Sequence, residues 1–368
     1  MPTRQFFCLL FLVFLSSCAS PAPADSSLTP LLIYLQSDPS GTTRLFAISP
    51  LPLGEGAGPA LSEGEVVRST PQPLSFSLPV DCSLYNLYPS PTDYLLAAEF
   101  YCVGGPAVQL LDLYTAQVTV PAEAYHVDSR FLAWSADGRY LYLKADSLGT
   151  SFILRVDVTN GRGKILDLPE TVYDMAALPD GRILYALSRG LGFGSEVWSA
   201  KSDGLSASLL FSEPADIVAY LRPSPDGSQV AYILLPDSST PFPEGELWLR
   251  GISGENARFL AAADAGHGYA PAWSPDGTQI AFVTRLTSEP FTSRLSLYDF
   301  ADASLTPLTQ FDGAVAGTPV WSPDGTSMVF DLSRDGTIQV WIEDFSTGVL
   351  LPLDESAASC CAVWLPGK

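Results

Sequence analysis

A five-residue motif recurs along the chain at nearly constant spacing, and this repeat limits the fold more than any other feature of the sequence. The motif Trp-Ser-Pro-Asp-Gly occurs unchanged at residues 273–277 and 321–325, and residues 134–138 differ from it at one position. Three weaker copies complete the set. The last residues of the six copies fall at positions 93, 138, 181, 227, 277 and 325. Such spacing is typical of the four-stranded blades of a β-propeller, at roughly 40–50 residues per blade.

The chemistry of the motif predicts a tight turn that is followed by a strand. Proline fixes φ, aspartate can bond its own backbone, and glycine accepts the positive φ that ends the turn. Short apolar runs follow the copies, for example residues 140–143, 229–233 and 279–283. Their length favours strands buried on both faces over helices. A third strand, such as residues 295–298, and an outer strand with proline, such as residues 304–308, complete each expected unit.

The seven tryptophans fall at two positions of the repeat. Four of them end an expected first strand, and three lie in an expected third strand: Trp134, Trp273, Trp321 and Trp364, and then Trp198, Trp248 and Trp341. An aromatic side chain at one place in every unit is typical of packing between blades rather than of a ligand platform.

The two ends of the chain predict how the ring closes. Residues 362–367 read as a first strand with the start of its turn, and residues 31–35 read as a second strand that has no first strand before it. Joining the two gives one composite blade, which also takes residues 44–48 and 66–76, with residues 50–64 as a surface loop. Closure removes the open sheet edge. We therefore expect an all-β fold, a seven-bladed propeller of residues 31–368, with six or eight blades as the alternatives.

The repeat resembles the WD40-like repeat of TolB-type propellers. The resemblance is carried by Trp-Ser-Pro-Asp-Gly-x-x-Ile-Ala-Phe at residues 273–282, by the aromatic third strand and by a Leu-Thr outer strand, and it extends over about residues 84–354. It implies the propeller fold and the turn residues, and it implies no site. TolB itself has six blades beside a separate N-terminal domain, for which the composite blade leaves no residues here.

The first residues have the layout of a bacterial lipoprotein leader. Residues 1–17 contain Arg4, a short apolar run and small residues before Cys18, and residues 15–18 resemble a lipobox. The apolar run is about half the ~20 residues of a membrane-spanning helix. We expect lipidation of Cys18, a Pro/Ala/Ser tether over residues 18–30, and a protein anchored outside the cytoplasm to the bacterial membrane by this lipid alone. An ordinary signal peptide cleaved near residues 18–20 is the alternative.

The composition excludes one large class of partner. The chain has 19 Lys and Arg against 40 Asp and Glu, a net charge of −21, with a sequence pI near 4.2. Such a surface repels phosphate backbones and anionic headgroups, so no nucleic acid is expected as a partner. The acidity is typical of a soluble exposed surface, and an acidic recognition face is the other interpretation.

Four cysteines remain after Cys8 and Cys18. Cys82 and Cys102 flank the first expected hairpin and are the disulfide candidate, since oxidation is possible outside the cytoplasm. Cys360 and Cys361 could bridge each other or stay free. No metal site is expected, because neither His126 nor His267 is near them in sequence.

No sequence signal points to catalysis. The Gly-x-Ser-x-Gly signature of a hydrolase is missing, and the repeated aspartates of the motif lie at turns, where a structural role is expected: Asp137, Asp180, Asp226, Asp276 and Asp324. We expect a monomeric, cofactor-free binding or scaffolding protein for protein, peptide or glycan, at one face or in the channel. The alternative is a hydrolase or lyase. Carboxylates and arginines that converge on the channel with raised pKa values would favour the enzyme, and an apolar patch on one face would favour the binding protein.

Overall fold

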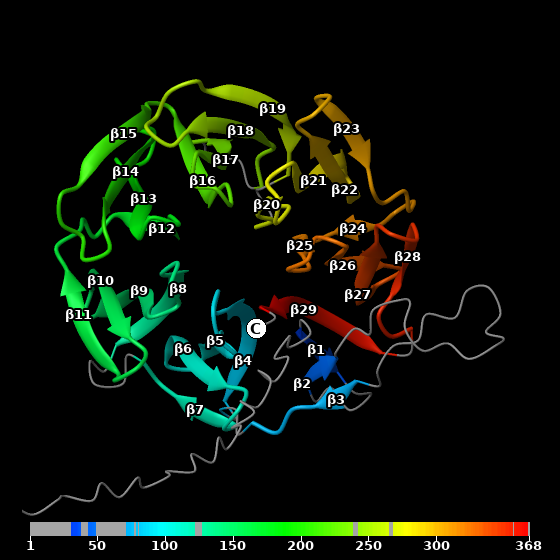
Figure 1. Ribbon diagram of the computed structural model, residues 1–368, viewed down its shortest axis with the longest axis horizontal. Coiled ribbons are helices and arrows are strands. Elements are labelled where there is room, and N and C mark those ends of the chain that lie inside the picture. The colour runs from blue at the N-terminus through cyan, green and yellow to red at the C-terminus, as the bar shows by residue number, and fades with distance from the viewer. Residues whose placement is uncertain are drawn as a thin grey trace, which may run out of the picture.

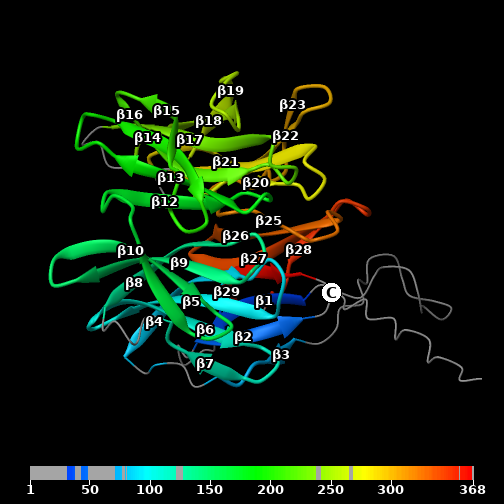
Figure 2. The ribbon, with the colours of Figure 1, turned by 60° about the vertical axis from the view of Figure 1, so that its left-hand side comes forward.

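The described strands form seven antiparallel sheets around a central channel. The computed structural model describes residues 31–37, 43–48, 71–76, 79, 81–121, 127–237, 242–264, 268–355 and 357–366, and these residues contain 29 strands and no helix. Figure 1 looks down the channel, and Figure 2 shows the same ring obliquely, turned by 60°. The predicted all-β, seven-bladed propeller is confirmed.

Six of the blades are continuous in sequence, and their strands run in order from the channel to the rim. Blades 1 to 3 consist of β4 (Cys82–Pro89), β5 (Leu95–Cys102), β6 (Gly105–Asp112) and β7 (Gln117–Thr119); β8 (Asp128–Trp134), β9 (Tyr140–Ser147), β10 (Thr150–Asp157) and β11 (Arg162–Leu166); and β12 (Val172–Ala177), β13 (Arg182–Ser188), β14 (Ser195–Lys201) and β15 (Ser208–Glu213).

Blades 4 to 6 repeat this plan. They consist of β16 (Asp216–Pro223), β17 (Gln229–Pro236), β18 (Gly245–Gly251) and β19 (Arg258–Ala263); β20 (Ala272–Trp273), β21 (Gln279–Ser288), β22 (Phe291–Asp299) and β23 (Ser304–Pro307); and β24 (Val315–Ala316), β25 (Val320–Trp321), β26 (Ser327–Arg334), β27 (Thr337–Asp344) and β28 (Val349–Pro352). Both β24 and β25 pair with β26, so the inner strand of blade 6 is interrupted.

Blade 7 is built from both ends of the chain. β29 (Ala358–Leu365) is its inner strand and pairs with β1 (Leu31–Ser37), which is followed by β2 (Thr43–Ile48) and β3 (Gln72–Pro73). The register places Leu31 opposite Leu365 and Ser37 opposite Ala358. The predicted closure is therefore present. The outer strand is shorter than the expected residues 66–76, and residues 1–30, the expected loop 50–64 and residue 367 lie outside the described residues.

The turn motif is a small network of hydrogen bonds. In blade 2 the Ser135 hydroxyl donates to the Asp137 carboxylate at 2.6 Å, while the backbone N–H of Tyr140 donates to the Ser135 oxygen at 2.8 Å. Gly138 closes the turn at φ 68° and donates its N–H to the Ser135 carbonyl. The same pattern recurs around Ser224, Ser274 and Ser322. Asp and Ser therefore hold the turn, as expected.

Three first-strand tryptophans link their blade to the preceding blade. The indole N–H groups of Trp134, Trp273 and Trp321 donate to the backbone carbonyls of Tyr88, Arg222 and Ala272 at 3.1, 2.8 and 3.2 Å. Trp364 differs, because its indole nitrogen is buried and has no partner among the described residues. These contacts agree with the expected role of the tryptophans in packing between blades.

The meander of each blade defines two faces of the ring. The turns between first and second strands and between third and fourth strands lie on one side, which we call the turn face. The hairpins between second and third strands and the connections between blades lie on the other side, which we call the hairpin face. Since β1 is a second strand that starts opposite Leu365, the chain enters the ring on the turn face.

The core lies between the blades rather than inside any one of them. Second strands are the most buried, and residues 141–143 of β9 are completely inaccessible to solvent. A strand in the middle of a blade is covered on both sides by neighbouring blades, which explains its continuous apolar run. None of the described residues belongs to a helix long and apolar enough to cross a membrane.

Candidate functional site

Exposed apolar side chains gather on the hairpin face. Each of the six hairpins between second and third strands in blades 1 to 6 carries at least one large apolar residue that is open to solvent. Blade by blade these are Tyr101 and Val103, Leu148, Leu191 and Phe193, Phe242, Leu286, and Ile338. Val103, Leu148 and Leu191 are 94%, 105% and 82% exposed, which is the exposure of an unfolded side chain. The corresponding hairpin of blade 7, residues 38–42, lies outside the described residues.

The other surfaces of the ring are different. On the turn face, the exposed large apolar residues among those that the structure describes are Tyr114 and Leu205. The remaining ones lie singly near the rim, on or just after outer strands, apart from Tyr85 within the inner strand β4. Scattered apolar residues are normal on a protein surface, whereas a set that recurs on one face of six blades is a candidate interaction site.

The hairpins of blades 3 and 4 are tied to each other. The Asp237 carboxylate accepts the backbone N–H groups of Gly192 and Gly194 at 2.6 and 3.3 Å. Gly194 has φ 71°, and a Cβ at this position would collide with the carbonyl oxygen of Glu213. The backbone that presents Leu191 and Phe193 is therefore held in one shape.

Blade 5 extends the same arrangement. The Arg285 guanidinium forms an ion pair with buried Asp264 and donates to the carbonyl oxygens of Phe242 and Pro243 at 2.9 and 3.3 Å. The main chain beside Phe242 is thus fixed to the next blade. Hairpins that are ordered before binding lose less conformational entropy when a partner docks.

A second candidate region lies at the channel wall, where the buried Glu99 and the half-buried Asp174 and Asp331 support the inner strands. The Asp174 carboxylate accepts the N–H of Leu221 at 2.8 Å, and Asp331 accepts the N–H of Cys361 at 3.0 and 3.1 Å. Glu99 accepts the Tyr88 hydroxyl at 3.0 Å and a backbone bond from Phe131. In all three cases the N–H belongs to the inner strand of the following blade.

These carboxylates have raised pKa values, and burial is the main cause. Burial raises the pKa of Asp331 to about 6, against which the bond from Cys361 acts weakly. Burial likewise raises the pKa of Asp174, opposed by the charge of Arg222, and the pKa of Glu99, opposed by the Tyr88 hydroxyl and the charge of Arg130.

Carboxylates with raised pKa values at the channel wall are one of the features expected of an enzyme. Here, however, each carboxylate already accepts hydrogen bonds from the protein. The inner strands are irregular at the points where the N–H groups are accepted, with register shifts in β8, β16 and β29. A bulge leaves an N–H without a partner in its own sheet, and a carboxylate of the preceding blade accepts it. This explains the three carboxylates by structure alone.

The cysteines lie at the hairpin face and the channel wall. Cys82 and Cys102 are cross-strand neighbours in β4 and β5 and are joined by a disulfide with a Cα–Cα distance of 4.1 Å. Cys360 and Cys361 lie in β29 with their sulfur atoms 2.6 Å apart. Cys18, His126 and His267 lie outside the described residues, and within those described no three His, Cys, Asp or Glu side chains gather as metal ligands.

The turn aspartates remain at the turns. The serine hydroxyl of the same turn donates a hydrogen bond to each of Asp137, Asp226, Asp276 and Asp324. The bond from Ser224 is the main cause that lowers the pKa of Asp226 to about 2. The apolar hairpin residues are not apparent from the sequence, because they lie in loops or at strand ends that share no motif. The available signal was an apolar residue set among glycines and serines, as in residues 190–194 and 147–149.

Comparison with known proteins supports the fold. Residues 180–359 match the family described as the TolB beta propeller domain, which confirms the predicted resemblance to TolB-type repeats. No curated protein matches the chain in sequence.

Solved structures with a similar fold include TolB and two enzymes. TolB from Acinetobacter baumannii is 16% identical, with 92% of this chain and 67% of that chain covered and a TM-score of 0.52. An oligogalacturonate lyase in complex with manganese is 16% identical over 89% and 85% of the two chains (TM-score 0.56), and a prolyl endopeptidase is 10% identical over 91% and 51% (TM-score 0.58). At these identities the similarity shows the fold alone.

Proposed function

We propose that this chain is a non-catalytic binding protein, held outside the cytoplasm by a lipid on Cys18, which receives a protein or peptide partner on its hairpin face. The observation that carries the proposal is the set of exposed apolar residues on six consecutive hairpins. The hydrogen bonds that fix the backbone at Gly192, Gly194 and Phe242 support a binding role, and the engaged carboxylates of the channel wall argue for a structural role there.

The orientation of the ring favours a polypeptide over the anchoring membrane as the partner. The chain enters blade 7 at Leu31 on the turn face. A lipid on Cys18 would therefore attach to the turn face and leave the apolar hairpins pointing away from the bilayer. Apolar and aromatic tips are also the usual anchors of protein interfaces.

The test is photo-crosslinking at single positions in the native membrane. p-Benzoylphenylalanine replaces Leu148 or Leu191 on the hairpin face, and Leu205 on the turn face is the matched control. We expect a discrete protein adduct from the first two positions that is lost when Phe193→Ser is added, and none from Leu205. Equal adducts from both faces, or adducts that Phe193→Ser leaves unchanged, would overturn the proposal.

A channel enzyme is the second candidate. The raised pKa values of Glu99, which is near Arg130, of Asp174, which is near Arg222, and of Asp331 favour it. It is tested by incubation with oligogalacturonides and proline-containing peptides, followed by mass spectrometry. Cleavage that Arg222→Ala abolishes would replace the binding proposal, and no cleavage of either substrate class would remove this candidate for those substrates.

A further inference from the structure

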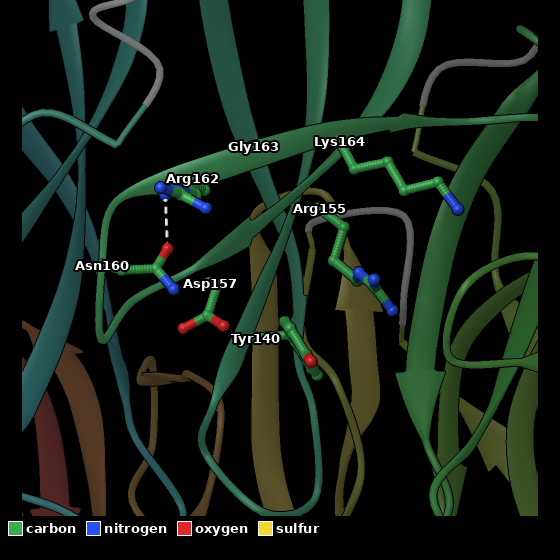
Figure 3. Close-up of a pocket in the computed structure, with 7 residues that line it drawn as sticks. All are labelled: Tyr140, Arg155, Asp157, Asn160, Arg162, Gly163 and Lys164. Carbon is green, nitrogen blue, oxygen red and sulfur yellow. Dashed lines mark hydrogen bonds between the residues drawn. The ribbon is translucent and has the colours of Figure 1, made fainter.

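A small cavity opens on blade 2 beside the turn between β10 and β11, at the turn face (Figure 3). Its volume is about 200 Å³, several times the ≈ 30 Å³ that a water molecule occupies in the liquid. Its lining includes Arg155, Arg162, Lys164 and Asn160, with Tyr140 and Asp157.

The lining carries an excess of positive charge. The one carboxylate, Asp157, already accepts two bonds from Arg139, at 3.0 and 2.9 Å, and one from the Thr159 hydroxyl at 2.6 Å. The bond from Thr159 and the ion pair with Arg139 lower the pKa of Asp157. The charge of Asp157 is therefore balanced by Arg139. The lining contains no other carboxylate to neutralise its three cations, Arg155, Arg162 and Lys164.

Arg155 is held in position, while the other two cations are available. The Arg155 guanidinium lies 4.3 Å from the centre of the Tyr140 ring and donates one bond to the Ser202 carbonyl at 3.0 Å. Arg162 and Lys164 are exposed and form no ion pair with any residue that the structure describes. The side chain of Asn160 accepts the Arg162 backbone N–H, which leaves its amide group as a further donor.

This local excess of positive charge contrasts with the net charge of −21 of the whole chain. Some arginines elsewhere are neutralised by a nearby carboxylate, as in the pairs Arg182–Asp180, Arg250–Glu213 and Arg285–Asp264. The three cations around the cavity therefore form a local positive charge on a chain whose net charge is strongly negative.

We propose that this cavity is a binding site for a phosphate-type oxyanion. Planar guanidinium groups and an ammonium are the donors that bind phosphate through charge-assisted hydrogen bonds. Two sources share this chemistry, a free phosphate or phosphate ester and the headgroup of an anionic lipid. The turn face, on which the chain enters the ring, is the side on which a headgroup would be met. The site is independent of the partner proposed for the hairpin face.

The test uses the full chain with Cys18→Ser, so that no lipid is added to it. Inorganic phosphate is titrated in a calorimeter at low and high salt, and flotation is measured with vesicles of phosphatidylglycerol and of phosphatidylcholine. We expect phosphate binding that Arg162→Ala/Lys164→Ala weakens at least about tenfold and that salt weakens further. The control is Arg44→Ala, which removes an exposed arginine of blade 7 and should leave binding unchanged.

The two arms identify the source. Flotation with phosphatidylglycerol alone, lost in the double variant, assigns the site to a headgroup, whereas binding of free phosphate without flotation assigns it to a soluble ligand. Absence of binding in both arms, or binding that the double variant and Arg44→Ala affect equally, would overturn the proposal.

Discussion

Asp331 is the residue whose replacement should change stability in the most distinctive way. Asp331 is half-buried between blades 6 and 7, and desolvation of its carboxyl group raises the pKa from 3.8 to about 6. Between about pH 3.8 and pH 6, the carboxyl group is therefore protonated in the native state and ionised in the unfolded chain. For a carboxyl group with a raised pKa, stability falls as the pH rises through this window.

The magnitude follows from the size of the shift. At 1.36 kcal/mol per pKa unit, the rise from 3.8 to about 6 corresponds to about 3 kcal/mol of lost unfolding free energy at pH 7. Asp331→Asn removes the titration and keeps an oxygen that can accept the Cys361 N–H. Since pH 4 already lies just above the unfolded pKa, the difference in unfolding free energy between the variant and the wild type should move in favour of the variant by about 2.4 kcal/mol from pH 4 to pH 7.

The assay is urea unfolding of both proteins at several pH values in this range. Comparing the change with pH cancels the cost of burying the new amide, which does not titrate. Asp302→Asn is the control, because Asp302 lies at an exposed turn and bonds from Ser304 lower its pKa. A difference between Asp331→Asn and the wild type that stays constant within 1 kcal/mol across the range would refute the reasoning.

Three further predictions concern the disulfide, the tryptophans between blades and the lipid on Cys18. Replacing both Cys82 and Cys102 by serine should destabilise the protein by about 3 kcal/mol, the loop-closure value for a sequence separation of 20, and a thermal scan that shows no loss would contradict a disulfide in the native protein. Trp273→Phe removes the bond to the Arg222 carbonyl and should cost about 1 kcal/mol more than Trp364→Phe, whose indole has no partner among the described residues; equal melting temperatures would contradict this. Cys18→Ser should release the protein from membranes in a fractionation experiment, and continued membrane association would contradict lipidation.

Much of the fold could be predicted because its turn chemistry is local. Serine, aspartate and glycine of the motif bond to each other within five residues, so the sequence alone indicates where a first strand ends and a second begins. Closure by residues 31–37 and 358–365 could also be predicted, since a strand without a partner at each end leaves one arrangement without an open edge.

The candidate sites depend on contacts that the sequence does not display. Asp331 and Cys361 are 30 residues apart and meet because a bulge in β29 turns an N–H towards the neighbouring blade. Leu148 and Phe242 share no motif, and their common face appears only once the hairpins of six blades are seen to lie on the same side of the ring.

The binding role of the hairpin face is tested most directly by affinity for the partner that the crosslinks identify. Burying Leu191 and Phe193 should contribute about 1.5–3 kcal/mol each, so Leu191→Ser/Phe193→Ser should weaken binding by about 100-fold or more. Leu205→Ser/Tyr114→Ser alters two exposed apolar residues of the turn face and should change the affinity less than about twofold. Equal losses from the two pairs, or an unchanged affinity in the first, would contradict binding at the hairpin face.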